Sequence, residues 1–151
     1  MGELARILVI DDDKTIRLTM AAILRAEGFT VDTAETGKEA IDKSNINNYN
    51  LALVDIRLPD IMGTELLSKL KKTDPPMVKI IVTGFPALQN AIDAVNKGAN
   101  AYVLKPADPQ KLIEIVKNCL QKQKEASPSN QLKVKDARAC ITVAWSYKND
   151  L

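Results

Sequence analysis

Three consecutive carboxylates, Asp11, Asp12 and Asp13, directly follow an apolar run at residues 5–10. Two like charges ~4 Å apart repel by about 1 kcal/mol in water, and by several times that amount beside a low-dielectric core. A helix N-terminus, a bound cation, or both would offset this repulsion. The stretch therefore predicts a cation site, a helix start, or both at the end of a buried strand.

Three further polar residues stand at or near the ends of other apolar runs. Asp55 lies in NLALVDI (50–56), Thr83 ends VKIIVT (78–83), and Lys105 follows NAYVL (100–104). Carboxylates that converge at one edge of a sheet suit Mg²⁺, and a lysine and a hydroxyl can contact phosphoryl oxygens. Asp55 itself has two possible roles, metal ligand and nucleophile, because carboxylates attack phosphorus to give aspartyl phosphates.

The elements that must position these residues alternate along the chain. Apolar and alternating runs predict strands, and amphipathic stretches with caps or breakers predict helices. The strands are expected at 5–10, 30–34, 50–56, 78–83 and 100–104, and the helices at 14–27, 36–41, 64–72, from Pro86 to just before Gly98, and 108–122. Such alternation on short connections predicts an α/β fold, a doubly wound five-stranded parallel sheet with helices on both faces. Ligands bind beyond the carboxyl ends of such strands, where the polar residues above are placed.

The helical patterns also predict which side chains are buried. In the third helix, Leu66, Leu67 and Leu70 are expected to face the core, and in the fourth, Ile92 and Val95 share the apolar side. Asp13 is expected to act as the N-cap of the first helix.

Composition narrows the classes of function. The chain has 151 residues, 46% hydrophobic and 26% charged, and a net charge of +2 with scattered basic residues, which argues against binding to nucleic acid or a membrane. The absence of histidine excludes Ser-His-Asp and Cys-His catalysis within the chain. Two cysteines without metal-ligand spacing, and no apolar run near ~18 residues, are typical of a cytoplasmic protein.

Residues 4 to about 122 resemble a response-regulator receiver domain of two-component signalling, of the chemotaxis-regulator type. The resemblance rests on the order and spacing of four motifs: VIDD (9–12), LALVDIRLPDIMG (51–63), IIVTG (80–84) and AYVLKP (101–106). It implies a flavodoxin-like strand order of 2-1-3-4-5. It also implies that Asp55 is the phosphoacceptor, and that Mg²⁺ is held by Asp55, by Asp12 directly, by Asp11 through water and by the backbone carbonyl of Arg57. Thr83 and Lys105 would contact the phosphoryl group, and Thr83 and Tyr102 would form the switch.

The resemblance implies a function in signalling. Such a protein takes a phosphoryl group from a sensor histidine kinase by self-catalysed transfer and is not a turnover enzyme, showing at most slow autodephosphorylation. Its output would be a conformational switch with homodimerisation through the face formed by the fourth helix, fifth strand and fifth helix. A phosphorelay intermediate without its own output is an alternative. A second alternative is a haloacid-dehalogenase-type phosphatase, because Asp11, Asp13 and Thr15 match its Asp-x-Asp-x-Thr spacing. In such an enzyme Asp11 would be the nucleophile and Asp13 the acid/base.

The end of the chain differs in composition. We expect residues 1–124 to form the receiver domain and 125–151 to form a tail, a linker or the start of a truncated effector domain. The segment holds one short apolar run, ACITVAW, and shows no basic recognition helix.

Overall fold

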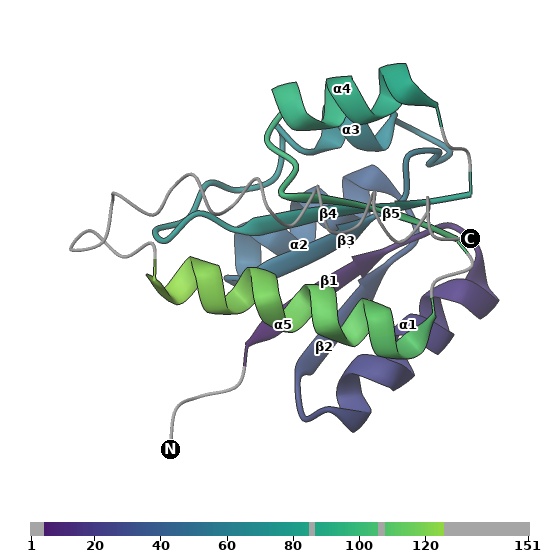
Figure 1. The fold of residues 1–151 in the computed structure, drawn as a ribbon. Coiled ribbons are helices and arrows are strands. Elements are labelled where there is room, and N and C mark those ends of the chain that lie inside the picture. Colours follow the sequence, from purple (N-terminus) through teal and green to yellow (C-terminus); the bar gives the residue numbers. More distant parts are fainter. Residues whose placement is uncertain (1–4, 85–86, 106–107, 126–151) are drawn as a thin grey trace.

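A five-stranded parallel sheet with strand order β2-β1-β3-β4-β5 forms the centre of the molecule (Figure 1). The computed structural model describes residues 5–84, 87–105 and 108–125. The strands are β1 (Arg6–Ile10), β2 (Thr30–Ala34), β3 (Leu51–Val54), β4 (Val78–Thr83) and β5 (Ala101–Leu104). The helices are α1 (Lys14–Ala26), α2 (Gly37–Ile46), α3 (Gly63–Leu66), α4 (Leu88–Asn96) and α5 (Pro109–Glu125). The predicted doubly wound, flavodoxin-like architecture is confirmed.

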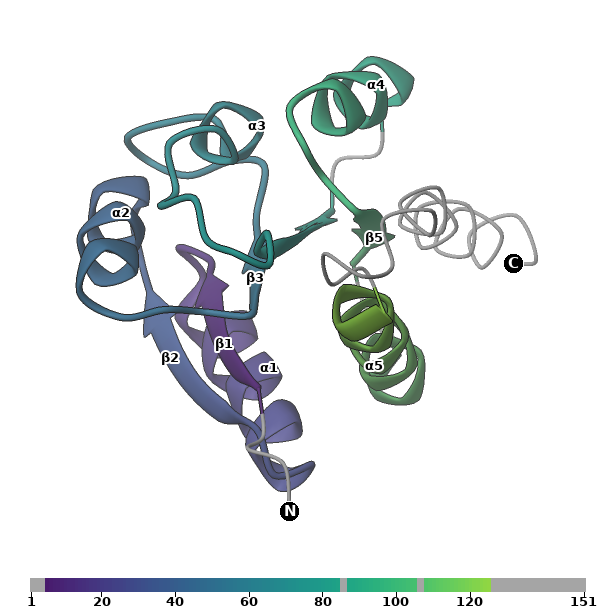
Figure 2. The ribbon, with the colours of Figure 1, turned by 90° about the vertical axis from the view of Figure 1, so that its left-hand side faces the viewer.

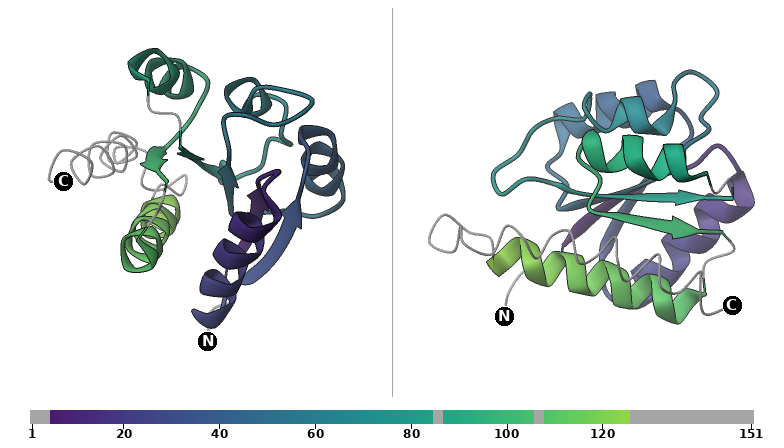
Figure 3. Two further views of the ribbon diagram at one scale, coloured as in Figure 1. Left: turned by 90° about the vertical axis from the view of Figure 1, so that its right-hand side faces the viewer. Right: turned by 45° about the horizontal axis from the view of Figure 1, so that its top comes forward.

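Helices cover the sheet on both faces (Figures 2 and 3). Helices α1 and α5 lie on one face, and α2, α3 and α4 lie on the other. Alternation along β1 serves both layers, because Ile7 and Val9 belong to the core beneath α1 and α5, while Leu8 and Ile10 belong to the opposite core. Burial on both sides explains why the strands are continuous apolar runs in the sequence.

Local caps begin α1 and α5 at the carboxyl edge of the sheet, and a glycine ends α1 at the amino edge. The Asp13 carboxylate accepts a hydrogen bond from the Ile16 amide at 3.0 Å, which confirms Asp13 as the N-cap of α1. Gly28 follows α1 at φ 96°, a left-handed conformation that terminates helices and favours glycine. Asp108 caps α5, accepting from the Gln110 amide at 3.3 Å.

The prediction of a helix over 64–72 was wrong in its extent. Helix α3 ends at Leu66, although the three leucines expected to face the core are buried. The Ser68 hydroxyl donates to the Glu65 carbonyl at 3.0 Å, the acceptor that the Lys69 amide would use in a continuing α-helix. The Lys69 amide instead donates to Leu66, only three residues back, at 2.9 Å. The Ser68 hydroxyl thus takes the carbonyl that the Lys69 amide would need, and the regular helix does not continue to residue 72.

Two other helices differ from the prediction. Helix α2 continues five residues past Ile41, to Ile46, because no breaker stands in this polar stretch. On α4, Ile92 and Val95 are exposed by 43% and 42%, whereas Ala94 is fully buried. The smaller residue faces the sheet, and the two larger apolar side chains lie on the outer part of the helix.

Among the helices that the structure describes, none combines the length and apolar character needed to cross a lipid bilayer. The predicted tail or linker lies outside the described residues, apart from Glu125 at the end of α5.

Candidate functional site

The carboxylates of Asp11, Asp12 and Asp55 meet at the carboxyl edge of the sheet. Asp11 and Asp12 follow β1 and Asp55 follows β3, its neighbour in the sheet. One oxygen from each residue lies within 4.8 Å of the others. Asp11 and Asp55 are buried and Asp12 is exposed, so the cluster has a closed inner side and an accessible outer side.

Lys105 brings one positive charge to this cluster from the end of β5. Its Nζ lies 2.5 Å from Asp11 Oδ2 and 3.4 Å from Asp55 Oδ2. The lysine is separated from Asp11 by 94 residues in the chain, and the parallel sheet brings the two together. An ammonium group here can both neutralise the acids and contact a bound anionic oxygen.

Asp55 still lacks full compensation for its charge. Its Oδ1 is buried without a hydrogen-bond partner among the described residues. Burial raises the pKa of the Asp55 carboxyl above its ordinary value; the charge of Lys105 opposes this rise, and the charge of Asp11 adds to it. An oxygen left in this way fits a hard divalent cation, and three converging carboxylates are the ligands that Mg²⁺ prefers. The residues present therefore fit the predicted metal.

Thr83 and Tyr102, predicted to form the switch, are both buried on neighbouring strands. Thr83 ends β4, and Tyr102 pairs in register with Ile81 of that strand. Alternation along β4 places Thr83 and Ile81 on the same face, where Tyr102 packs near Ala94 of α4. Burial raises the pKa of the Tyr102 hydroxyl, and a hydrogen bond with the backbone of Ala87 partly offsets the rise.

The loop after β3, which carries Arg57, is fixed at both ends. The Gly63 amide donates to the Ile56 carbonyl at 2.6 Å. The Asp60 carboxylate accepts from the backbone amides of Gly37 and Lys38, both at 2.9 Å, at the start of α2. The hydrogen bonds from these two backbone amides hold the pKa of the Asp60 carboxyl below its ordinary value. Arg57 forms an isolated bridge with Met62, and its carbonyl as a metal ligand stays a prediction.

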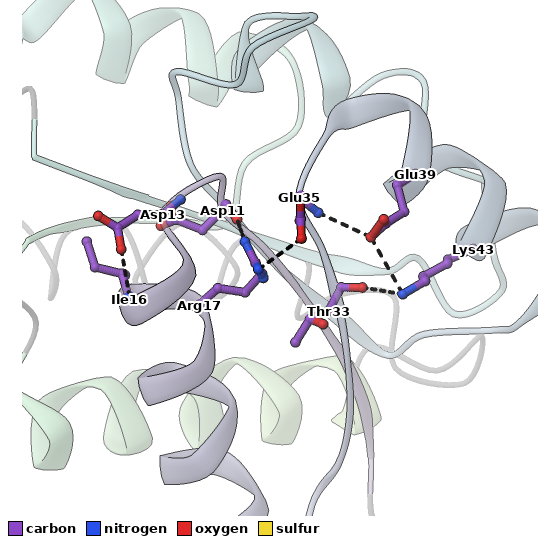
Figure 4. A network of polar contacts seen from close by, with 8 residues as sticks. All are labelled: Asp11, Asp13, Ile16, Arg17, Thr33, Glu35, Glu39 and Lys43. Carbon is purple, nitrogen blue, oxygen red and sulfur yellow. Dashed lines mark hydrogen bonds and ion pairs between the residues drawn. The ribbon is translucent and has the colours of Figure 1, made fainter.

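Arg17 is a residue of this site that the sequence analysis did not identify (Figure 4). Its side chain is buried on α1, donates to the Asp11 carbonyl, and pairs with Glu35 after β2. Glu39, the third residue of α2, in turn accepts from the Glu35 amide at 3.2 Å. The available signal was a charged residue at helical spacing with the buried Met20, which is unusual unless the charge has partners.

A pocket of about 550 Å³ joins the acid cluster to a groove beside α1. Its polar wall includes the three acids and Lys105, and its apolar wall comes from α1, β4 and α5. The apolar lining residues are Ile16, Met20, Ile23, Val82 and Leu112. The space is ample for a metal ion and a phosphoryl group.

Comparisons with known proteins agree with this geometry. Residues 7–117 match the family described as the response regulator receiver domain. The solved structure of a CheY-like receiver domain protein from Methanospirillum hungatei JF-1 is 44% identical with a TM-score of 0.79, over 83% of this chain and 100% of that chain. NtrX from Brucella abortus, solved in complex with ADP, is 31% identical with a TM-score of 0.75, over 81% of this chain and 28% of that chain.

Curated relatives are longer proteins. The transcriptional regulatory protein ZraR of Klebsiella oxytoca is 35% identical over 111 residues, which are 74% of this chain and 25% of that protein. The cell cycle response regulator CtrA of Brucella ovis is 29% identical over 119 residues, 79% of this chain and 51% of that protein. The chain thus spans between a quarter and about half of the length of these relatives.

The family match also decides between the two interpretations of the opening carboxylates. The phosphatase alternative required Asp13 as an acid/base, but the Asp13 carboxylate caps α1. The match runs through β1, β3, β4 and β5, whose ends supply Asp11, Asp55, Thr83 and Lys105. Because sheet order, site geometry and family match agree over the same residues, the chain belongs to the response regulator receiver domain family of two-component signal transduction.

Proposed function

We propose that this protein accepts a phosphoryl group on Asp55 from a sensor histidine kinase in the cytoplasm and signals through the resulting change of conformation. The observation that carries the proposal is the position of the buried Asp55 carboxylate, whose Oδ2 lies 3.4 Å from Lys105 Nζ. One of its oxygens also lies within 4.8 Å of a carboxylate oxygen of Asp11 and of Asp12. Since these 151 residues contain no histidine, the donor imidazole must lie outside them.

In the proposed transfer, a carboxylate oxygen of Asp55 attacks the phosphorus of the donor phosphohistidine. A new O–P bond forms, the P–N bond breaks, and its electron pair remains on the donor imidazole nitrogen. Lys105 lies where its ammonium can neutralise one phosphoryl oxygen, and Thr83 supplies a hydroxyl at the end of the adjacent strand. Mg²⁺ bound by Asp12, Asp55 and the Arg57 carbonyl, with Asp11 through water, would supply further charge neutralisation at the phosphoryl oxygens.

The switch is supported by the layer that contains Tyr102. Thr83 and Tyr102 share the α4 side of the sheet, so a phosphoryl group that engages Thr83 acts on the layer in which the ring packs. Helix α4 already exposes Ile92 and Val95, two apolar side chains that a partner could cover. We therefore propose that phosphorylation promotes homodimerisation through the α4-β5-α5 face.

The chemistry is tested by incubating the full chain with acetyl phosphate and Mg²⁺ and measuring its intact mass. We expect addition of one phosphoryl group to the wild type and to Asp13→Asn, and none to Asp55→Asn. Modification of Asp55→Asn to the wild-type extent would refute Asp55 as the acceptor.

The output is tested by sedimentation of the chain with and without beryllofluoride plus Mg²⁺. A switch predicts a shift towards dimer, weakened by the double change of Ile92 and Val95 to Ser. An unchanged assembly state together with phosphoryl transfer to a histidine protein would favour the phosphorelay alternative.

A further inference from the structure

Arg17 connects the acid cluster to the start of α2 without offering a metal ligand itself. Its side chain is 7% exposed, although α1 lies at the surface. Its Nη1 donates to the backbone oxygen of Asp11 at 2.9 Å, and its Nη2 lies 3.2 Å from Glu35 Oε1. A planar guanidinium with its donors in a fixed fork suits two acceptors in two different loops.

The hydrogen bond from Arg17 fixes the peptide unit immediately before Asp12. The carbonyl of Asp11 and the amide of Asp12 belong to one planar group, so holding the carbonyl sets the orientation of the whole unit. The next peptide unit is held as well, because the Asp13 amide donates to Asp11 Oδ1 at 2.9 Å. The Arg17 amide donates to the Asp13 carbonyl at 2.9 Å, as the first bond of the helix.

This arrangement matters because the Asp12 side chain is exposed, whereas Asp11 and Asp55 are buried. Packing restrains the two buried carboxylates directly, but the position of an exposed one depends on its backbone. Both peptide units that flank Asp12 are hydrogen-bonded, and Arg17 supplies the bond on one side.

We propose that Arg17 is a positioning residue that holds the Asp11–Asp12 backbone in the geometry that binds Mg²⁺. The inference rests on the proposed function, since it assumes that the acid cluster holds this ion. Partners that orient the ligands of a metal typically contribute a factor of about 10 to 100 in affinity.

The charge of Arg17 and its positioning role predict opposite changes in Mg²⁺ affinity when Arg17 is replaced. The direction of the measured change therefore tests the proposal. The positively charged guanidinium of Arg17 is hydrogen-bonded to the backbone of Asp11. A positive charge so close to the site disfavours a bound cation. If charge were its only effect, Arg17→Met would bind Mg²⁺ more tightly than the wild type. If positioning dominates, the same variant binds Mg²⁺ more weakly.

The experiment is a calorimetric titration of Mg²⁺ into the full chain. Arg17→Met is expected to raise the dissociation constant by about 10-fold. Arg17→Lys keeps the charge but lacks the fork, so it is also expected to bind more weakly than the wild type. Glu35→Gln removes the ion pair but leaves the Asp11 bond available, and we expect a smaller loss.

Arg25→Met is the matched control. Arg25 is also on α1 and donates to a backbone carbonyl, that of Val31, at 2.8 Å, and it does not line the pocket that holds the acids. We expect its Mg²⁺ affinity to equal that of the wild type. Unfolding curves in EDTA establish that each variant is folded, and Arg17→Lys carries the test if Arg17→Met does not fold.

The outcomes separate this inference from the proposed function. If the wild type binds no Mg²⁺, or if Asp12→Asn and Asp55→Asn bind it unchanged, the proposed function is refuted. If the wild type binds Mg²⁺ through these acids but the Arg17 variants bind it equally or more tightly, only the positioning role is refuted.

Discussion

At the scale of single residues, the acid cluster places negative charge where the fold does not fully compensate for it. Asp11 has Lys105 and the Asp13 amide as partners, whereas Asp55 Oδ1 is buried with no partner among the described residues. Burial raises the pKa of the Asp55 carboxyl. The positive charge of Lys105 lowers this pKa, and the negative charge of Asp11 raises it further. The site is thus arranged for a ligand at some cost to the stability of the free protein.

We therefore expect Asp55→Asn to raise the free energy of unfolding at neutral pH in the absence of divalent cations. The gain should be about 1 kcal/mol, the scale of an ordinary single substitution, because the amide removes an incompletely paired buried charge. Urea unfolding in EDTA measures the difference. Asp42→Asn, an exposed acid on α2, is the control and should change stability by less than about 0.5 kcal/mol.

The pH dependence follows from the same shift. A carboxyl whose pKa is higher in the folded than in the unfolded chain contributes stability that is fully present below the unfolded value of about 3.9. That contribution is lost as the pH rises through the raised pKa of the folded state. The difference in the free energy of unfolding between Asp55→Asn and the wild type should consequently grow over this pH range and then level off. A difference that shrinks with rising pH would contradict a raised pKa of Asp55.

At the scale of elements, the close approach of α3 to β3 supports the site. A Cβ atom on Gly63 would lie 2.1 Å from the backbone oxygen of Asp55 and 2.9 Å from Cα of Ile56. Both neighbours are backbone atoms, which cannot move away as a flexible side chain can. The absence of a side chain at Gly63 is therefore required for the observed path of the chain after β3.

Gly63→Ala is accordingly expected to lower the free energy of unfolding by about 1–3 kcal/mol, the usual cost of overpacking. It should also weaken Mg²⁺ binding, because the displaced backbone belongs to Asp55. Gly84→Ala is a suitable comparison, since among the described residues its added Cβ would meet Lys105 Cβ alone, at 4.0 Å. Equal unfolding midpoints for the two variants would argue against a steric requirement at Gly63.

At the scale of the whole molecule, the end of α5 is tied to the opposite, amino edge of the sheet. Gln123 is 9% exposed, and its Nε2 donates to the carbonyls of Asn50 and Pro76, both at 2.9 Å. These carbonyls precede β3 and β4. One side chain thus joins the last helix to two segments that lie before the central strands.

Gln123→Ala should destabilise the protein by about 1–3 kcal/mol, because it removes two part-buried hydrogen bonds, those to the carbonyls of Asn50 and Pro76. The matched change is Gln121→Ala on the same helix, whose side chain makes an exposed bond to Glu125 at 3.3 Å and should matter little. Thermal unfolding of both variants compares them directly. Alanine is the better helix former, so helix propensity cannot cause a loss in either variant. A loss as large in Gln121→Ala would therefore argue against the two hydrogen bonds of Gln123 as the source of the effect.

We propose that residues 1–124 form the receiver unit and that 125–151 are a tail, a linker or the start of an effector domain. Since Gln123 is required for the tie described above, a chain ended after Glu125 should unfold at the same midpoint as the full chain. A chain ended after Lys122 should be less stable.

Much of the architecture was determined by the sequence. The apolar runs predicted β2 and β4 at their observed bounds, and Asp13, Thr36 and Asp108 were placed correctly at helix starts. These features depend on periodicity and on hydrogen bonds over a few residues, so short windows of sequence contain the information. The positions of Asp55 and Lys105 at strand ends followed in the same way.

Tertiary structure alone decided the features that depend on packing between distant segments. It left Ile92 and Val95 exposed while Ala94 faced the sheet, and it buried Arg17 between Asp11 and Glu35. The contact of Lys105 with Asp11 spans 94 residues and exists only once the sheet has formed. The periodicity of the sequence indicates which side chains prefer burial. Their contact partners and distances are set by how the helices pack on the sheet, and this packing determines the geometry of the site.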